Sequence, residues 1–120
     1  MMDYETPDIL VRVQDQVTIA RVKSTNLTSM SDIGRLSGSL ELLLKGGTLR
    51  LVIDFKLVQH IGSAALGMLI ALQKQMKDIG GRMVISHPEH IAELLQVSQT
   101  AKLFELAVDT KAAFKLLKPE

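Results

Sequence analysis

The sequence predicts a single α/β domain built on a mixed β-sheet, with the element order β-β-α-β-α-β-α-β-α. Through the last two thirds of the chain, short apolar segments with the spacing of strands alternate with amphipathic helical segments. Strands separated in this way pair in parallel through right-handed crossovers. Near the start, two strand-like segments follow each other too closely for a helix to lie between them, which predicts an antiparallel hairpin. The length of 120 residues allows one domain of this kind.

The beginning of the chain predicts a flexible tail followed by the hairpin. Residues 1–8 are polar and acidic, and we expect a tail there, outside a domain that covers residues 9–118. Apolar and polar side chains alternate in residues 9–14 and start to do so again in residues 17–22, which is the period of half-buried strands. The polar turn between them lacks the Asn-Gly or Asp-Gly pair that most favours a tight hairpin.

The middle of the chain predicts a helix followed by a buried strand. Polar residues 24–31 form a loop, in which Ser31 or Asp32 would cap the helix, and glycines 46 and 47 end it. Residues 49–53 are apolar except for one arginine, which is typical of a central strand covered on both faces.

A second helix and a third buried strand come next. A loop over residues 55–62 leads into a helix over residues 63–79, whose apolar positions form one stripe. Residues 82–86 then contain an apolar strand. The remaining elements are predicted to be a helix that starts near Pro88, a short strand within residues 100–106 and a last helix capped by Asp109 or Thr110.

Composition and charge exclude several classes of function. The chain has 14 basic and 13 acidic residues, so it has no electrostatic footprint for a nucleic acid or a membrane surface. Aromatic residues make up only 3%, which argues against base stacking on single strands. The absence of cysteine excludes disulfides and thiolate metal sites. Residues 1–7 lack the features of a secretory signal and the longest apolar segment is too short to span a bilayer, so we expect a cytoplasmic protein.

The sequence contains no catalytic constellation, so we expect a binding protein that is not an enzyme and that needs no cofactor or metal. His87 and His90 lie three residues apart with Glu89 and Glu93 beside them, but no further histidine or cysteine joins them in sequence as a metal site would need. There is also no phosphate-binding glycine loop and no nucleophile elbow around Ser63.

Several short segments resemble one known family. Residues 51–55 read Leu-Val-Ile-Asp-Phe, and residues 62–67 read Gly-Ser-Ala-Ala-Leu-Gly at the start of a helix. A Gly-Gly pair precedes the strand at residues 80–85, and Leu-Phe ends residues 100–104. In their order and spacing these segments resemble the STAS domain of sulfate transporters and anti-sigma factor antagonists.

The resemblance implies a fold and a function. The fold is a mixed sheet with helices packed mainly on one side. The function is that of a protein-binding module, which docks an anti-sigma factor that is also a serine kinase. Such a module works in a partner-switching pathway that regulates sigma-factor-dependent transcription. For this chain it implies a partner that is a protein, neither nucleic acid nor membrane, and a chain that is a monomer or weak homodimer.

The chain departs from the family pattern at the start of the second helix. The family has Asp-Ser-Ser-Gly where this sequence has Gly62, Ser63, Ala64 and Ala65. The usual phosphoacceptor is the second serine, which falls on Ala64, so only the neighbouring Ser63 keeps a hydroxyl. Ser63 is therefore either a helix cap or the phosphorylated residue of this chain.

The resemblance also implies a docking surface around this helix start. Asp54 would either form a charged rim of that surface or bind the backbone of its own loop, and His60 would be either a docking contact or a solvated side chain. The predicted partner-binding residues are Asp54, Gln59, His60, Gly62, Ser63, Ala64, Leu66 and Gly67.

Two alternatives remain open from the sequence. The chain could be a scaffold subunit of a larger signalling assembly or a homodimer, which the unusual residues 62–65 would favour. It could instead be a receiver-like phosphorelay domain that uses Asp54 at the end of its central strand. That chemistry needs an acidic pair after the first strand to hold Mg²⁺, and here a polar turn over residues 14–16 follows it.

Overall fold

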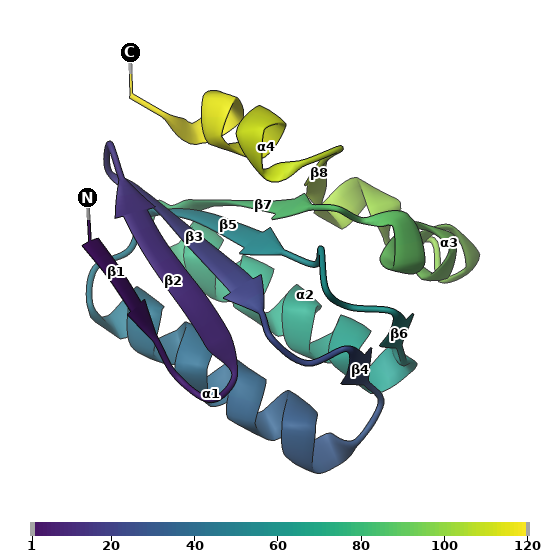
Figure 1. Ribbon diagram of the computed structural model, residues 1–120. Coiled ribbons are helices and arrows are strands. Elements are labelled where there is room, and N and C mark those ends of the chain that lie inside the picture. The colour runs from purple at the N-terminus through teal and green to yellow at the C-terminus, as the bar shows by residue number, and fades with distance from the viewer. Residues whose placement is uncertain (1, 120) are drawn as a thin grey trace.

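The segments with alternating or continuous apolar residues form a six-stranded mixed sheet in the strand order β1-β2-β3-β5-β7-β8 (Figure 1). The computed structural model describes residues 2–119. Strands β1, β2 and β3 pair antiparallel, and β3, β5, β7 and β8 pair in parallel. The strands are β1 Met2–Glu5, β2 Ile9–Gln14, β3 Val17–Val22, β4 Asn26–Leu27, β5 Arg50–Asp54, β6 His60–Ile61, β7 Arg82–Ser86 and β8 Glu105–Ala107. The helices are α1 Met30–Lys45, α2 Ser63–Asp78, α3 Glu89–Val97 and α4 Thr110–Leu117, with a 3₁₀ turn at Ala101–Leu103.

The predicted fold class is confirmed, including the opening hairpin. A loop of two residues joins β2 to β3, and Asp15 and Gln16 both take positive φ angles of 49° and 68°. Two central residues with positive φ match the right-handed twist of the flanking strands, which is why such turns close tight hairpins. The pair therefore adopts the geometry that Asn-Gly would favour, without the glycine.

The expectation of a flexible tail is wrong for residues 2–5, which form the edge strand β1. Asp3 pairs with Arg12 across the strands, and Tyr4 pairs with Val11. Polar side chains suit an edge strand because one of its faces meets water, so the sequence lacks the apolar run that marks an inner strand. The tail was predicted from polarity alone, and polarity does not distinguish a tail from such an edge.

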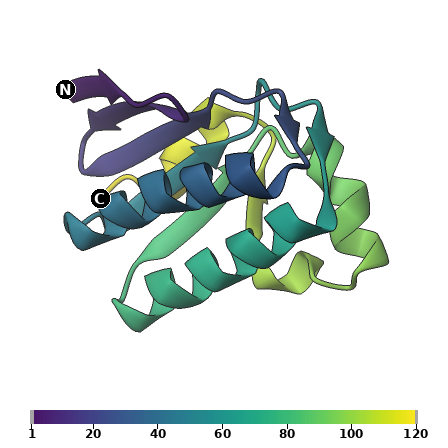
Figure 2. The same cartoon turned by 90° about the horizontal axis from the view of Figure 1, so that it is seen from below.

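The helices lie mainly on one side of the sheet, as expected. Helices α1 and α2 run side by side beneath it, and the short α4 lies on the opposite face (Figures 1 and 2). The larger core joins the sheet to α1, α2 and α3, and its fully buried side chains include Leu36, Leu40, Leu51, Ile53, Leu69, Met76, Met83, Ile85, Ile91 and Leu95. A smaller core under α4 contains Val17, Val52, Val84, Ala107, Ala113 and Leu117.

The predicted caps of α1 and α4 have different outcomes in the structure. Its cap is Ser29, whose hydroxyl accepts a hydrogen bond from the Asp32 backbone at 3.1 Å, so the prediction of Ser31 or Asp32 as the cap is wrong. Asp109 caps α4, as one of the two predicted candidates. Gly47 takes a φ of +96° after α1, a conformation that glycine adopts without strain.

An exposed ion pair ties β7 to β8 and predicts a small effect of pH on stability. The Arg82 guanidinium donates to Glu105 at 2.7 Å, and this hydrogen bond lowers the pKa of Glu105. A lowered carboxyl pKa stabilises the fold above the unfolded value of about 4.3, and that stabilisation is lost as the pH falls through the folded pKa. Because both side chains are about half exposed, we expect Glu105→Gln to cost less than about 1 kcal/mol at pH 7 and almost nothing at pH 3.

Urea unfolding of both proteins at the two pH values measures this difference. Glu93→Gln is the control, because Glu93 is exposed and no ion pair is described for it among residues 2–119. A cost of Glu105→Gln that stays the same at pH 3 would contradict the assignment.

Candidate functional site

Two segments that were predicted to be loops meet beyond the carboxyl ends of β3 and β5, which are inner strands of the main sheet. Strand β4 lies between β3 and α1, and β6 lies between β5 and α2. The two short strands pair in parallel, with Asn26 opposite His60 and Leu27 opposite Ile61. Leu27 is almost fully buried and anchors this pair against the core. The predicted loops over residues 24–31 and 55–62 each therefore contain a short strand.

The pairing of β4 with β6 sets two helix starts next to each other. Helix α1 begins with Ser29 as its cap and α2 begins with Gly62 as its cap. The Gly62 backbone N–H donates to the Leu27 carbonyl at 3.0 Å. Figures 1 and 2 show that both helices start beside β4 and β6 and run in the same direction. The positive ends of two helix dipoles therefore point to the same edge of the molecule.

Ser63 is the first residue of α2 and is exposed to solvent. The cap position belongs to Gly62, which makes no side-chain cap bond, so the interpretation of Ser63 as the helix cap is wrong. No hydrogen bond of the Ser63 hydroxyl is described within residues 2–119. The first turn of α2 also contains no acidic residue, so no side chain of that turn neutralises the helix end.

The predicted docking residues divide into exposed and buried groups. Gln59, His60, Ala64 and Gly67 are exposed, and Gly62 is partly exposed. Leu66 retains only 6% of its surface and belongs to the larger core. Its place in the predicted docking set is therefore wrong, because it faces inward on the apolar side of α2.

Asp54 is fully buried and serves as a structural acceptor. Arg21 donates to its Oδ2 at 2.8 Å, and the Thr110 hydroxyl donates to the same oxygen at 3.2 Å. Its Oδ1 accepts from the Ser86 hydroxyl at 3.2 Å and from the Lys56 backbone N–H at 3.0 Å. The bond to Lys56 confirms the loop-binding interpretation of Asp54, and the burial contradicts the interpretation as a charged rim.

The same geometry argues against the receiver-like alternative. A phosphorylated aspartate must be reachable and must lie beside a bound Mg²⁺. Asp54 has no exposed surface, and residues 2–119 contain no group of three or more side chains that could hold a metal ion.

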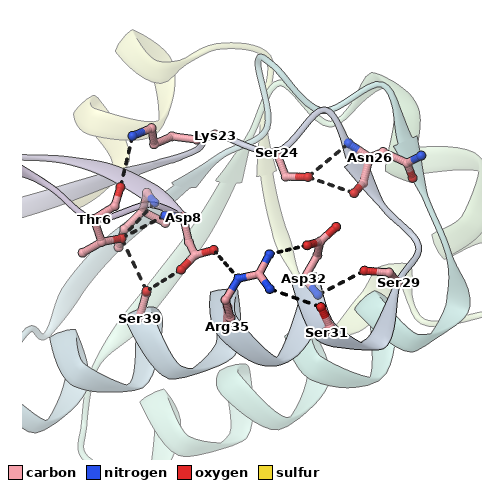
Figure 3. A network of polar contacts seen from close by, with 11 residues as sticks. Thr6, Asp8, Lys23, Ser24, Asn26, Ser29, Ser31, Asp32, Arg35 and Ser39 are labelled. Carbon is pink, nitrogen blue, oxygen red and sulfur yellow. Dashed lines mark hydrogen bonds and ion pairs between the residues drawn. The ribbon is translucent and has the colours of Figure 1, made fainter.

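A polar network holds the start of α1 in place (Figure 3). Arg35 forms ion pairs with Asp32 of its own helix and, at 3.5 Å, with Asp8 of the connection between β1 and β2. Ser39 lies within hydrogen-bond distance of both Asp8 and Thr6 at 3.4 Å. These contacts fix α1 against the β1–β2 connection, so its exposed first residues keep a defined position beside the start of α2.

The sequence did not identify the α1 part of this surface. Thr28, Ser29 and Met30 are all exposed beside the start of α2, and Met30 exposes 73% of its surface. No local signal marks them, because their neighbours across the β4–β6 pair lie more than 30 residues away in the chain.

In the part of the chain that the structure describes, no helix is long and apolar enough to cross a membrane.

Comparisons with known proteins agree with this architecture. An anti-sigma factor antagonist domain protein from Planctomyces limnophilus is 19% identical, with a TM-score of 0.80 over 94% of this chain and 99% of that one. An anti-sigma factor antagonist from Mycobacterium paratuberculosis is 23% identical, with a TM-score of 0.77 over 97% and 100%. The Bacillus cell fate determinant SpoIIAA in its phosphorylated form is 13% identical, with a TM-score of 0.68 over 90% and 98%.

These likenesses show a shared fold. No curated protein sequence matches the chain significantly. The sequence model described as "Mlab, STAS domain" matches residues 14–107, which is most of the chain and includes β3 to β8. The chain therefore belongs to the STAS domain family.

Proposed function

We propose that this chain is a protein-binding module of the anti-sigma factor antagonist type and performs no chemistry of its own. Its partner would be an anti-sigma factor that is also a serine kinase. The docking surface would comprise the start of α2 and the exposed residues of the β4–β6 pair beside it. The observation that carries this proposal is the exposure of Ser63 at a helix start with no acidic residue in its first turn. Solved relatives described as anti-sigma factor antagonists support the class of partner.

The proposed mechanism is competition for one surface of the anti-sigma factor. A module that binds the anti-sigma factor removes it from the sigma factor by mass action, and the sigma factor becomes free. This function places the module in the cytoplasm with the transcription machinery. The module needs no cofactor for it, because the only requirement is a complementary surface.

Phosphorylation of Ser63 would reverse the docking. A phosphate adds a charge of about −2, and the open helix end of α2 tolerates that charge because its N–H groups point toward it. A docked partner would have to bury the same charge, which is costly. The fold would therefore survive the modification while the complex dissociates. The phosphorylated form of SpoIIAA, which shares the fold, supports a switch of this kind.

We expect Ser63→Asp to weaken docking at least tenfold, which is about 1.4 kcal/mol, since the carboxylate imitates part of the phosphate charge. The melting temperature should stay the same or rise slightly, because an acidic residue at a helix start stabilises the helix by about 0.3–1 kcal/mol. Titration calorimetry against each serine-kinase-type anti-sigma factor of the source genome, with a thermal melt of each variant, measures both effects.

The control is Ser63→Ala, which should bind as tightly as the wild type and should take no phosphate from the kinase and ATP. Phosphate on Thr28 or Ser29 instead of Ser63 would move the switch to the other helix start. The absence of any complex with these anti-sigma factors would remove the proposed function.

A further inference from the structure

The outer surface between α1 and α2 contains a groove that the fold does not fill. Its upper part, the hollow nearest the starts of the two helices, has a volume of about 270 Å³. The walls of this upper hollow include Met30 and Gly34 of α1 and Ala64 and Met68 of α2. A second hollow of about 350 Å³ continues along the same helix pair toward Ile79. Glu41 and Gln75 border both hollows, so the two form one channel along the helices. Figure 2 shows α1 and α2 lying side by side along this length.

Two residues of the upper part of the groove have no packing role inside the chain. Gly34 lies inside a helix, where glycine is about 0.5–1 kcal/mol less favourable than alanine. A Cβ added to Gly34 would meet no atom within 4 Å, so no packing inside the chain requires a glycine. Met30 exposes 73% of a large apolar side chain at the end of the same groove. Gly38 and Gly67 also lie inside helices with open space at the Cβ position, so a helical glycine alone does not mark the groove. Gly34 differs from them because it lines the hollow beside the exposed side chain of Met30, where the backbone of another chain has room to approach.

The charged residues that line the groove indicate which kind of side chain a binding partner would place there. Glu41 lies partly buried where the two hollows meet, and within residues 2–119 no ion pair or hydrogen bond of its side chain is described. None of the residues that form the upper hollow carries a charge apart from Glu41. Lys45 and Asp78, farther along, oppose each other in charge. The groove therefore offers an apolar half followed by the Glu41 carboxylate, which has Lys45 one turn further along α1 and no ion pair described within residues 2–119.

We propose that this groove receives one amphipathic helix of the protein partner. The apolar stripe of that helix lies over Met30, Gly34 and Met68, and a lysine or arginine on it pairs with Glu41. A helix laid in a groove between two others is a common mode of peptide recognition, and small wall residues allow the backbones to approach. The groove is continuous with the proposed docking surface, because Ala64 follows Ser63 and lines the upper hollow. The inference rests on the proposed function and extends its surface from the helix starts along α1 and α2.

The test compares one substitution inside the groove with the same substitution outside it. Gly34→Gln places a side chain in the groove, whereas Gly38→Gln adds it one turn later in α1, at an exposed position that does not line the groove. A Cβ at either position meets no atom within 4 Å, so both variants should fold and melt at or above the wild-type temperature. Titration calorimetry against the anti-sigma factor that binds the wild-type chain should show at least tenfold weaker binding for Gly34→Gln and less than a twofold change for Gly38→Gln.

Charge reversal tests the second part of the inference. Glu41→Lys should weaken binding about tenfold, because it sets two positive charges against each other, while Glu41→Gln should weaken it only a few-fold. Wild-type affinity in both Gly34→Gln and Glu41→Lys would overturn the groove as a docking site and leave the proposed function intact. Equal losses in Gly34→Gln and Gly38→Gln would overturn it as well, since the effect would not depend on the groove. If no anti-sigma factor binds the wild-type chain, the proposed function fails and this inference fails with it.

Discussion

Replacing Asp54 with alanine is expected to lower the free energy of unfolding by about 2–4 kcal/mol, because it removes a fully buried acceptor of four hydrogen bonds, one of them from a charged and partly exposed arginine. The carboxylate has no exposed surface and accepts from Arg21, Ser86, Thr110 and the Lys56 backbone. Its removal leaves the Arg21 guanidinium without its ion-pair partner and leaves two hydroxyl groups without the acceptor of their hydrogen bonds. Equilibrium unfolding in urea, followed by circular dichroism, measures the loss.

Two further variants separate charge from shape at this position. Asp54→Asn keeps the volume but removes the charge, so a smaller loss of about 1–3 kcal/mol is expected. Glu105→Gln breaks the exposed pair with Arg82 and should cost less than about 1 kcal/mol. The difference from the loss in Asp54→Ala shows how much the burial of the carboxylate contributes. A loss below 1 kcal/mol for Asp54→Ala would mean that its four donors find other acceptors, and the structural role assigned to Asp54 would be wrong.

Truncating Leu40 to alanine is expected to lower the free energy of unfolding by about 2–5 kcal/mol, as for other buried leucines. Leu40 has no exposed surface and lies in the larger core between α1 and the sheet. The loss combines the missing apolar transfer energy with the cavity that the side chain leaves behind. The same urea experiment measures it.

Leu42 provides a matched control two residues further along the same helix. It exposes 66% of its surface, so Leu42→Ala should change the free energy of unfolding by less than about 0.5 kcal/mol. Both substitutions change helix propensity equally, and the difference between them isolates burial. Equal losses in the two variants would contradict the orientation of α1, in which Leu40 faces the sheet and Leu42 faces solvent.

The main sheet and its helices could be predicted from the sequence because their signals are local. The alternation in residues 9–14 and the apolar run in residues 49–53 each specify a strand from neighbouring residues alone, and glycine pairs mark the helix ends. The edge strand β1 escaped prediction because its polar side chains match those of a tail. The β4–β6 pair escaped because each strand has only two residues and its partner is distant in sequence.

The candidate site was predictable in part for the same reason. The family pattern located the start of α2, and the structure exposes Ser63, Gln59 and His60 there. The cap at Gly62 was missed because backbone geometry, and no side-chain chemistry, decides which residue begins the helix. Arg21 and Thr110 lie 33 and 56 residues from Asp54 in the chain, so only the folded sheet brings them to its carboxylate.

The β4–β6 pair joins two connections of the chain into one structural unit. Three hydrogen bonds join Gln59 and His60 to the Thr25 carbonyl and Gly62 to the Leu27 carbonyl, so neither segment holds its shape without the other. A chimaera that imports the residues before α2 from a relative should therefore also import the residues before α1. Specificity for a new partner would then be transferred only when both segments are exchanged together. Exchanging one segment alone would disturb the backbone hydrogen bonds between the two.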